Sequence, residues 1–211
     1  MFDSRKIVPF LIEIILPKKC LSCGRFGKYI CPKCFDKIFE PEARSLPSLN
    51  IVISAGAYAN PILKRILRQF KFRRSQALKD DLADLMLKAA GSNLTAGSQI
   101  LAIPMTAKRK RERGFNQAEL LAKTLAQKTN LPLADGLVKI KKTKPQAEIK
   151  IRKERLENVK NAFGLKPGFK PAETVILIDD ISTTGATLSE AARVLKKAGT
   201  KKVIGLVVAG G

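Results

Sequence analysis

The feature that most constrains this chain is the stretch at residues 174–195, TVILIDDISTTGATLSEAARVL. The apolar, β-branched run at 174–178 predicts a buried strand, because such runs suit a strand that is covered on both faces. Two aspartates and a turn of small, hydroxylated residues follow. Ala186 to Ala198 then has the apolar spacing of a helix, which is expected to stop at Gly199. A strand that leads through a tight turn into a helix is the repeating unit of α/β proteins.

The rest of the chain repeats this alternation. Further strands are expected at 51–58, 99–105 and 202–209, and further helices from Pro61 to Phe70, over 78–89 and over 115–128. Strands that alternate with helices predict right-handed βαβ units around a mostly parallel sheet flanked by helices, so the expected fold class is α/β. We expect three parts: an N-terminal helix with a cysteine module over 1–40, a Pro- and Ser-containing linker over 41–50, and the α/β domain over 51–211.

The turn after the 174–178 strand is a candidate ligand site, since ligands of open α/β sheets bind at the carboxyl ends of strands. Free N–H groups and hydroxyls at a helix start suit a phosphate. Carboxylates suit sugar hydroxyls or a hydrated Mg²⁺. Together they match a ribose 5-phosphate, whereas the alternative is a plain helix cap by Ser182 or Thr183, with Asp180 favouring the helix dipole. The candidate residues are Asp179, Asp180, Thr183, Thr184, Gly185, Ala186 and Thr187.

A run of positive charge follows the expected strand at 99–105. Cations on a loop between a strand and a helix can neutralise a diphosphate, and arginine adds bidentate hydrogen bonds. The alternative is a charge run that faces only solvent. The position of the run, after a strand of the same sheet, favours the ligand interpretation. The cations are Lys108, Arg109, Lys110, Arg111 and Arg113.

All four cysteines of the chain lie in one short segment, as Cys20-x-x-Cys23 and Cys31-x-x-Cys34. Paired C-x-x-C knuckles direct their thiolates at one tetrahedral ion, which predicts a structural Zn²⁺ site; disulfides and an iron–sulfur centre are the alternatives. A segment this small cannot build a core alone, so the metal is expected to supply its folding free energy. The clustering, without an export signal, indicates a reducing cytoplasm.

The 174–187 stretch resembles the phosphoribosyl diphosphate (PRPP) signature of type I phosphoribosyltransferases, an apolar strand followed by Asp-Asp and Thr-Thr-Gly-x-Thr. Three further features are similar to the ComF family, whose members serve DNA uptake during natural competence. These are the string RERGFNQ at 111–117, the four-cysteine module, and the segment 143–163, TKPQAEIKIRKERLENVKNAF.

The resemblance implies a type I phosphoribosyltransferase-like fold that binds PRPP with Mg²⁺. It implies that Asp179 and Asp180 hold the ribose hydroxyls as the catalytic pair, and that residues 183–187 hold the 5-phosphate. It also implies that Lys108 and Arg109 contact the diphosphate. In such enzymes a mobile hood often closes over the site. Segment 143–163 is expected to contribute to a hood, with a basic unstructured loop as the alternative.

The charge of the chain favours polyanionic partners, because 40 Lys and Arg against 18 Asp and Glu give a net charge of +22. Histidine is absent, which excludes Ser-His-Asp and Cys-His catalysis and His-ligated metals. A basic segment with Phe70, Phe72 and Phe115 for base stacking is a candidate surface for single-stranded DNA, and general solubility is the alternative. Its cations are Lys64, Arg65, Arg68, Lys71, Arg73 and Arg74.

Two functions from different classes stay open. The first is a competence-type protein that binds PRPP and single-stranded DNA, with competence or DNA-processing proteins as partners. The second is a metabolic phosphoribosyltransferase that joins ribose 5-phosphate to a base or amine and releases diphosphate. The chain ends at Gly211, soon after the 202–209 strand, and the little room left for a base-contacting segment favours the first function.

The apolar N-terminal segment, residues 1–16, has no run long enough to span a membrane. We expect it to be a retained docking helix, and peripheral contact with the inner face of the membrane is the weaker alternative. The expected location is therefore the cytoplasm.

Overall fold

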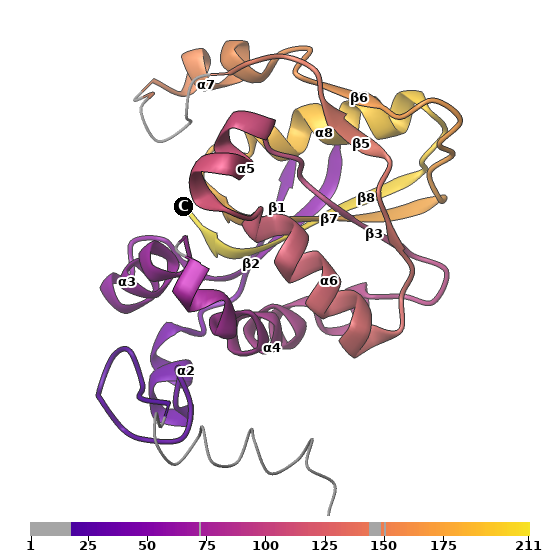
Figure 1. The fold of residues 1–211 in the computed structure, drawn as a ribbon. Coiled ribbons are helices and arrows are strands. Elements are labelled where there is room, and N and C mark those ends of the chain that lie inside the picture. The colour runs from indigo at the N-terminus through magenta and orange to yellow at the C-terminus, as the bar shows by residue number, and fades with distance from the viewer. Residues whose placement is uncertain (1–17, 72, 144–148, 150) are drawn as a thin grey trace, which may run out of the picture.

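The computed structural model describes residues 18–71, 73–143, 149 and 151–211 (Figure 1). Its centre is a six-stranded sheet in which every neighbouring pair is parallel except β1 and β2, which are antiparallel. This confirms the predicted α/β class with a mostly parallel sheet. In spatial order the strands are β1 (Glu42–Leu46), β2 (Leu49–Ala57), β8 (Lys202–Gly210), β7 (Thr174–Ser182), β3 (Gln99–Ala102) and β4 (Leu133–Ala134).

Helices cover both faces of the sheet (Figure 1). They are α2 (Pro32–Ile38), α3 (Pro61–Phe70), α4 (Lys79–Ala90), α5 (Ala107–Arg113), α6 (Gln117–Thr129), α7 (Arg152–Val159) and α8 (Ala186–Lys197), with 3₁₀ turns η1 (Arg73–Leu78) and η2 (Gly91–Asn93). The expected helices at 61–70, 78–89, 115–128 and 186–198 therefore form as α3, α4, α6 and α8, with ends shifted by a residue or two.

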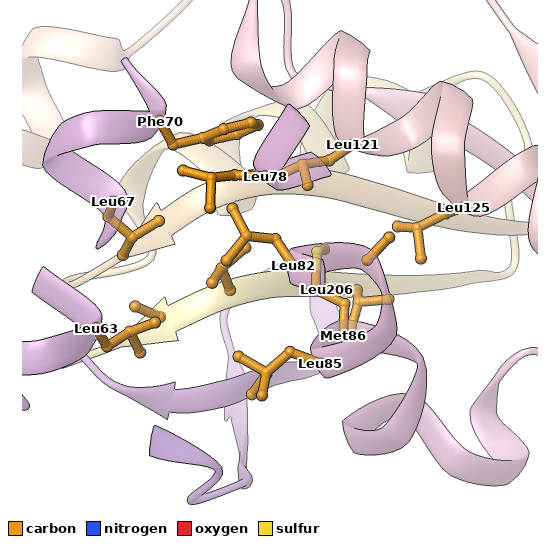
Figure 2. Close-up of a cluster of buried hydrophobic side chains, with 14 of the residues drawn as sticks. Leu63, Leu67, Phe70, Leu78, Leu82, Leu85, Met86, Leu121, Leu125 and Leu206 are labelled. Atoms are coloured by element: carbon orange, nitrogen blue, oxygen red, sulfur yellow. The ribbon is translucent and has the colours of Figure 1, made fainter. Parts of the chain in front are cut away.

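The alternation of side chains along the strands divides the core in two. Ile176 and Ile178 of β7 face a cluster with the leucines of α3, α4 and α6, part of which Figure 2 shows around Leu82 and Phe70. Val175 and Leu177 face the opposite cluster, which includes the apolar side of α8. The side chains on both faces of β7 are buried over residues 175–178, as its continuous apolar run predicted.

The prediction of a linker over 41–50 is wrong, because this segment forms β1, a turn and the start of β2. Glu42 pairs with Ser54 and Arg44 with Val52 in an antiparallel ladder. The turn residue Ser48 has a φ of 66°, a conformation that short hairpin turns use. The Pro and Ser residues that suggested a flexible connection instead belong to a β-hairpin at the edge of the sheet.

The cysteine module packs directly against the domain. Cys31, Cys34 and Ile38 are part of the same buried cluster as α3 and α4. The backbone N–H of Ile30 donates to the Asp81 carboxylate of α4 at 2.9 Å. Burial raises the pKa of Asp81, although that hydrogen bond opposes the rise. The module is therefore fixed to the domain by apolar contact and by a specific hydrogen bond.

The segment between α6 and β7 has more structure than its charge suggested. β5 (Leu137–Lys139) and β6 (Phe163–Leu165) pair antiparallel, apart from the main sheet, and α7 lies between them in the chain. Figure 1 shows α7 above the carboxyl ends of the central strands and β6 beside α8. Residues 1–16, on which the docking helix was expected, lie outside the described residues, and so do Phe72, Gln146 and the side chains of Arg73 and Arg74.

Candidate functional site

A cavity of about 320 Å³ opens at the carboxyl ends of β3 and β7, where the sheet geometry predicted a ligand. Arg109 of the basic run lines it together with the turn after β7. Lys108 is absent from the wall: its side chain is 82 % exposed, and Glu112 lies 4.0 Å from its ammonium. The cavity thus brings together most of the predicted residues: Asp179, Asp180, Thr183, Thr184, Gly185, Ala186, Thr187 and Arg109.

The turn between β7 and α8 depends on glycine at its tightest point. Gly185 has a φ of 74°, in the left-handed region that residues with a Cβ rarely adopt. A Cβ at this position would also lie 2.0 Å from the Leu46 side chain of β1. The N-cap residue of α8 is Gly185, which has no side chain to cap the helix, and the Thr184 hydroxyl accepts from the N–H of Ala186 at 3.4 Å. The plain-cap alternative is therefore wrong, because Ser182 belongs to β7 and the Thr183 hydroxyl has another partner.

Arg44 holds the same turn from the far edge of the sheet. Its guanidinium donates to the carbonyl oxygens of Ser182 at 3.0 Å, Thr183 at 2.5 Å and Gly211 at 3.3 Å. These bonds satisfy carbonyls where β7 leaves the ladder. Arg44 was not predicted, because it lies in the presumed linker and its contacts join residues 138 positions apart.

The two carboxylates lie near the carboxyl end of β7 and line the cavity. Burial raises the pKa of Asp179 well above its usual range, and repulsion from Asp180 adds to the rise. The backbone N–H of Asp180 donates to the Asp179 carboxylate at 2.9 Å and opposes the shift. Two adjacent acids without full compensation suit a cation or hydroxyl donors, in agreement with the predicted chemistry.

Lys139 of β5 is a cavity residue that the sequence did not reveal. Burial lowers its pKa, and the charge of Arg109 lowers it further, whereas Asp179 opposes the change. The ammonium lies 5.7 Å from the centre of the Phe163 ring. Positive groups therefore approach the carboxylates from α5 and from β5.

Arg155 of α7 joins the 143–163 segment to the turn between β7 and α8. Its guanidinium donates to the Thr183 hydroxyl at 2.7 Å and to the carbonyl of Ile149 at 2.7 Å. Thr143 and Val159 line the same cavity. The expected hood segment therefore reaches the site through a specific contact.

Asn161 attaches the carboxyl-terminal end of the 143–163 segment to α8. Its φ is 55°, and its N–H donates to the Glu190 carboxylate at 2.8 Å. Arg193 donates to the same carboxylate at 2.6 Å and to the Asn161 side chain at 3.2 Å. These partners lower the pKa of Glu190: the Arg193 hydrogen bond is the largest cause, burial opposes it, and the Asn161 N–H adds to it.

We expect Glu190→Gln to lower the free energy of unfolding at pH 7 by about 1–3 kcal/mol, because a hydrogen-bonded carboxylate is replaced by a neutral amide. The folded-state pKa of Glu190 is depressed, so its contribution is present above the unfolded value of about 4.3 and is lost as the pH falls through the folded value. Urea unfolding of both proteins between pH 7 and pH 3 measures this. A difference that grows toward low pH would contradict it.

The basic run forms the short helix α5 and not the expected loop. Thr106 caps it by accepting from the N–H of Arg109 at 3.4 Å, and Gly114 ends it at a φ of 83°. The helix divides its cations: Arg109 and Arg113 line the cavity, whereas Lys110 pairs with Glu119 at 2.6 Å outside it. Only part of the run is therefore placed to meet a ligand.

The four cysteines form one compact group of free thiols. Their sulfur atoms all lie within 4.8 Å of one another, and the Cys23 and Cys31 sulfurs are 3.5 Å apart. Tetrahedral Zn–S bonds of about 2.3 Å need sulfurs about 3.8 Å apart, so this group could hold zinc. Burial raises the pKa of Cys20, but backbone N–H groups of Cys23, Cys31 and Ser22 outweigh it and bring the value to about 6.

The basic face of α3 is partly as expected. Arg65 and Arg68 are exposed, and Lys64 and Lys71 are partly exposed. Lys71 also lines the cavity, so the expected DNA-binding surface extends from α3 to the cavity. Phe70 is fully buried and packs edge-on against Phe115 with ring centres 6.1 Å apart, so the prediction that it stacks on bases is wrong.

A family model and several known proteins are similar to this chain. A model of the phosphoribosyl transferase domain matches residues 113–210. Competence protein F of Haemophilus influenzae is 31 % identical over 193 residues, which are 87 % of this chain and 81 % of that protein. The chain belongs to the ComF family. A second ComF relative, competence protein ComFC of Bacillus subtilis, is 32 % identical over 85 % of this chain and 72 % of its own length.

Two further proteins resemble this ComF chain. DNA utilization protein YhgH of Escherichia coli strain K12 is 30 % identical, over 87 % of this chain and 85 % of that protein. The solved orotate phosphoribosyltransferase of Aeropyrum pernix is more distant, with 15 % identity and a TM-score of 0.38 over 90 % of this chain and 83 % of that one. In the part of the ComF chain that the structure describes, no helix has the length and apolar character needed to cross a membrane.

Proposed function

We propose that this ComF-family chain binds PRPP together with Mg²⁺ in the cavity between β3 and β7. The observation that carries the proposal is that one cavity is lined by an acidic pair, by a glycine-dependent turn at a helix start and by Arg109. Asp179 and Asp180 hold the ribose hydroxyls, the backbone and hydroxyls of 183–187 hold the 5-phosphate, and Arg109 faces the diphosphate.

Each group of the ligand has a matching partner. The Thr183 hydroxyl, oriented by Arg155, and the turn held by Arg44 preorganise the phosphate end. The raised pKa of Asp179 marks uncompensated negative charge, which hydroxyl donors or a nearby cation would offset. Mg²⁺ would neutralise diphosphate oxygens when bound. Lys108, which is exposed, is left out of the proposed diphosphate contacts.

We further propose that the chain binds single-stranded DNA along α3 and acts in DNA uptake or utilisation in the cytoplasm. Support comes from the net charge of +22, from the exposed cations of α3, and from relatives named for competence and for DNA utilization. The four free thiols suit a reducing compartment. Zn²⁺ on the cysteine group has a structural role here, since it would fix a module that packs on α4.

Transfer of the phosphoribosyl group to a base or amine is the second candidate function. Arg109 and Lys139 are two of the cations that line the cavity, and positive charge there would stabilise a departing diphosphate. Incubation of PRPP and Mg²⁺ with nucleobases or DNA, followed by assay of diphosphate, tests for turnover. Release that depends on the acceptor would establish transfer, and its absence would leave binding alone.

The two proposed ligands should respond to different substitutions. We expect the triple variant Lys64→Glu, Arg65→Glu and Arg68→Glu to lose most affinity for single-stranded DNA and to keep its affinity for PRPP. The wild-type log–log salt dependence should have a slope of about −0.7 for each phosphate contacted. Fluorescence anisotropy with a labelled oligothymidylate and calorimetry with PRPP measure the two affinities. Absence of DNA binding at about 0.1 M salt, where the Debye length is still about 10 Å, would contradict the DNA proposal.

A further inference from the structure

The proposed PRPP contacts leave one side of the cavity without an assigned ligand. This side is formed by the end of α3 and the start of α6, which meet where Phe70 packs edge-on against Phe115. Lys71 follows Phe70 and Gln117 lies two residues after Phe115, and both line the cavity. We call Lys71, Arg113 and Gln117 the α3–α6 corner.

Gln117 carries a buried hydrogen-bond donor that no residue in the described part of the chain satisfies. The residue is 2 % exposed, and its Oε1 accepts from the Arg113 guanidinium at 3.2 Å. That bond fixes the amide, so the Nε2 group is the free end. Among the described residues, Gln117 Nε2 is one of two buried side-chain polar atoms without a partner; the other, Ser182 Oγ, lines the same cavity. Buried donors are nearly always paired, which points to a ligand acceptor at this place.

The corner is chemically suited to an anionic oxygen. It offers an ammonium, a guanidinium and an amide N–H, which are all donors. The carboxylates among the described lining residues are Asp179 and Asp180, both on β7. A phosphate at the corner would therefore face only hydrogen-bond donors and positive charge, because none of the three corner side chains is acidic.

Positive charge continues from the corner to the surface of α3. Lys71, Arg68 and Lys64 follow one another at spacings of three and four residues, which places them on one side of the helix axis. The Lys64 ammonium lies 5.5 Å from the centre of the Tyr58 ring, and Tyr58 lines the cavity as well. In Figure 1, α3 and α5 lie on the side of the sheet where the chain ends. A basic track with one aromatic ring thus leads from α3 into the cavity.

We propose that the α3–α6 corner is the inner end of the DNA-binding surface, where one backbone phosphate of a single strand binds Lys71, Arg113 and Gln117 beside PRPP. This inference rests on the proposed function, and it adds that PRPP and single-stranded DNA bind in the same cavity. Tyr58 is placed for a base of the same strand, since base–aromatic stacking is independent of sequence.

Two substitutions test the corner, Lys71→Met and Gln117→Leu, each of which removes a donor and keeps most of the side-chain volume. Lys123→Met on the exposed side of α6 is the matched control. Anisotropy with a labelled oligothymidylate measures affinity at several salt concentrations, calorimetry measures PRPP–Mg²⁺ binding, and thermal melts establish folding. Lys71→Met keeps the test decisive if Gln117→Leu does not fold, because Lys71 is partly exposed.

We expect each corner variant to bind DNA at least about tenfold more weakly, as loss of a hydrogen bond to a charged group implies. Lys71→Met should also reduce the salt slope by about 0.7, whereas the neutral Gln117 should leave it unchanged. PRPP affinity and the control should not change. If wild-type protein binds DNA and both corner variants match it, the inference is wrong. A loss of PRPP affinity with DNA affinity kept also overturns it, since the corner would then hold the diphosphate. If wild-type protein binds no DNA, the DNA proposal itself fails, and the inference with it.

Discussion

Replacing Cys34 by Ser is expected to lower the thermal unfolding midpoint of the whole chain by about 10–20 °C. Cys34 is buried, and its group of four sulfurs has the dimensions of a zinc site. Structural zinc supplies the folding free energy of small modules, and a loss of about 5 kcal/mol shifts the midpoint of a chain this long by that amount. The effect should reach the domain, because Ile30 and Ile38 of the module are part of the main core.

The metal itself provides the complementary measurement. Purified wild-type protein should contain one zinc per chain by elemental analysis, and a strong chelator should reproduce the Cys34→Ser melt. Lys33→Met is the matched control: Lys33 lies on the same helix beside the cysteines but offers no sulfur ligand, so this variant should keep its zinc. Protein with no metal and two disulfides by mass would contradict the zinc prediction.

Gly185→Val should reduce PRPP affinity at least about 100-fold. A β-branched residue is strongly disfavoured at the φ of 74° found here, and its Cβ would collide with Leu46. The turn must move, and with it the N–H groups and hydroxyls proposed to hold the 5-phosphate. Calorimetry with PRPP and Mg²⁺ measures the loss.

Gly168→Val separates the binding effect from backbone strain. Gly168 has a nearly identical φ of 75°, but its missing Cβ faces open space and it lies outside the cavity wall. This variant should lose stability and keep its PRPP affinity. Equal losses of affinity in the two variants would show that Gly185 acts through general stability alone.

The parts of the site that are local in sequence were predictable. The apolar run, the Asp-Asp pair and the small-residue turn of 174–187 lie within one strand–turn–helix unit, and the structure places them as expected at the edge of the sheet. Periodicity alone also located the helices that cover the sheet, because their buried faces repeat at helical spacing.

Contacts between distant segments could not be predicted in this way. Arg44 and Leu46 hold the Gly185 turn, but they lie in a hairpin whose edge strand β1 is largely exposed and resembles a linker. Lys139 reaches the cavity from β5, a strand of three residues that is too short to show a periodic pattern. Tertiary pairing, which no local pattern encodes, placed these residues at the site.

The helix α5 was missed although its signals were present. Ala, Lys, Arg and Glu are all good helix formers, Thr106 is a favoured N-cap, and Gly114 is a favoured residue after a helix end. Blocks of like charge are typical of exposed, irregular segments, so the charge of the run by itself predicts a loop. A capped helix explains why Arg109 faces the cavity while its neighbour Lys108 faces solvent.

PRPP binding by the double variant Asp179→Asn and Asp180→Asn tests the central proposal most directly. The substitutions keep the size of both side chains and remove the carboxylates that would accept from the ribose hydroxyls. Titration calorimetry with PRPP and Mg²⁺ should show saturable binding by the wild-type protein and none by the variant, whose melt and DNA affinity should be unchanged. Equal PRPP affinity of a folded variant and the wild type, or no binding by either, would contradict the assignment of this cavity to PRPP.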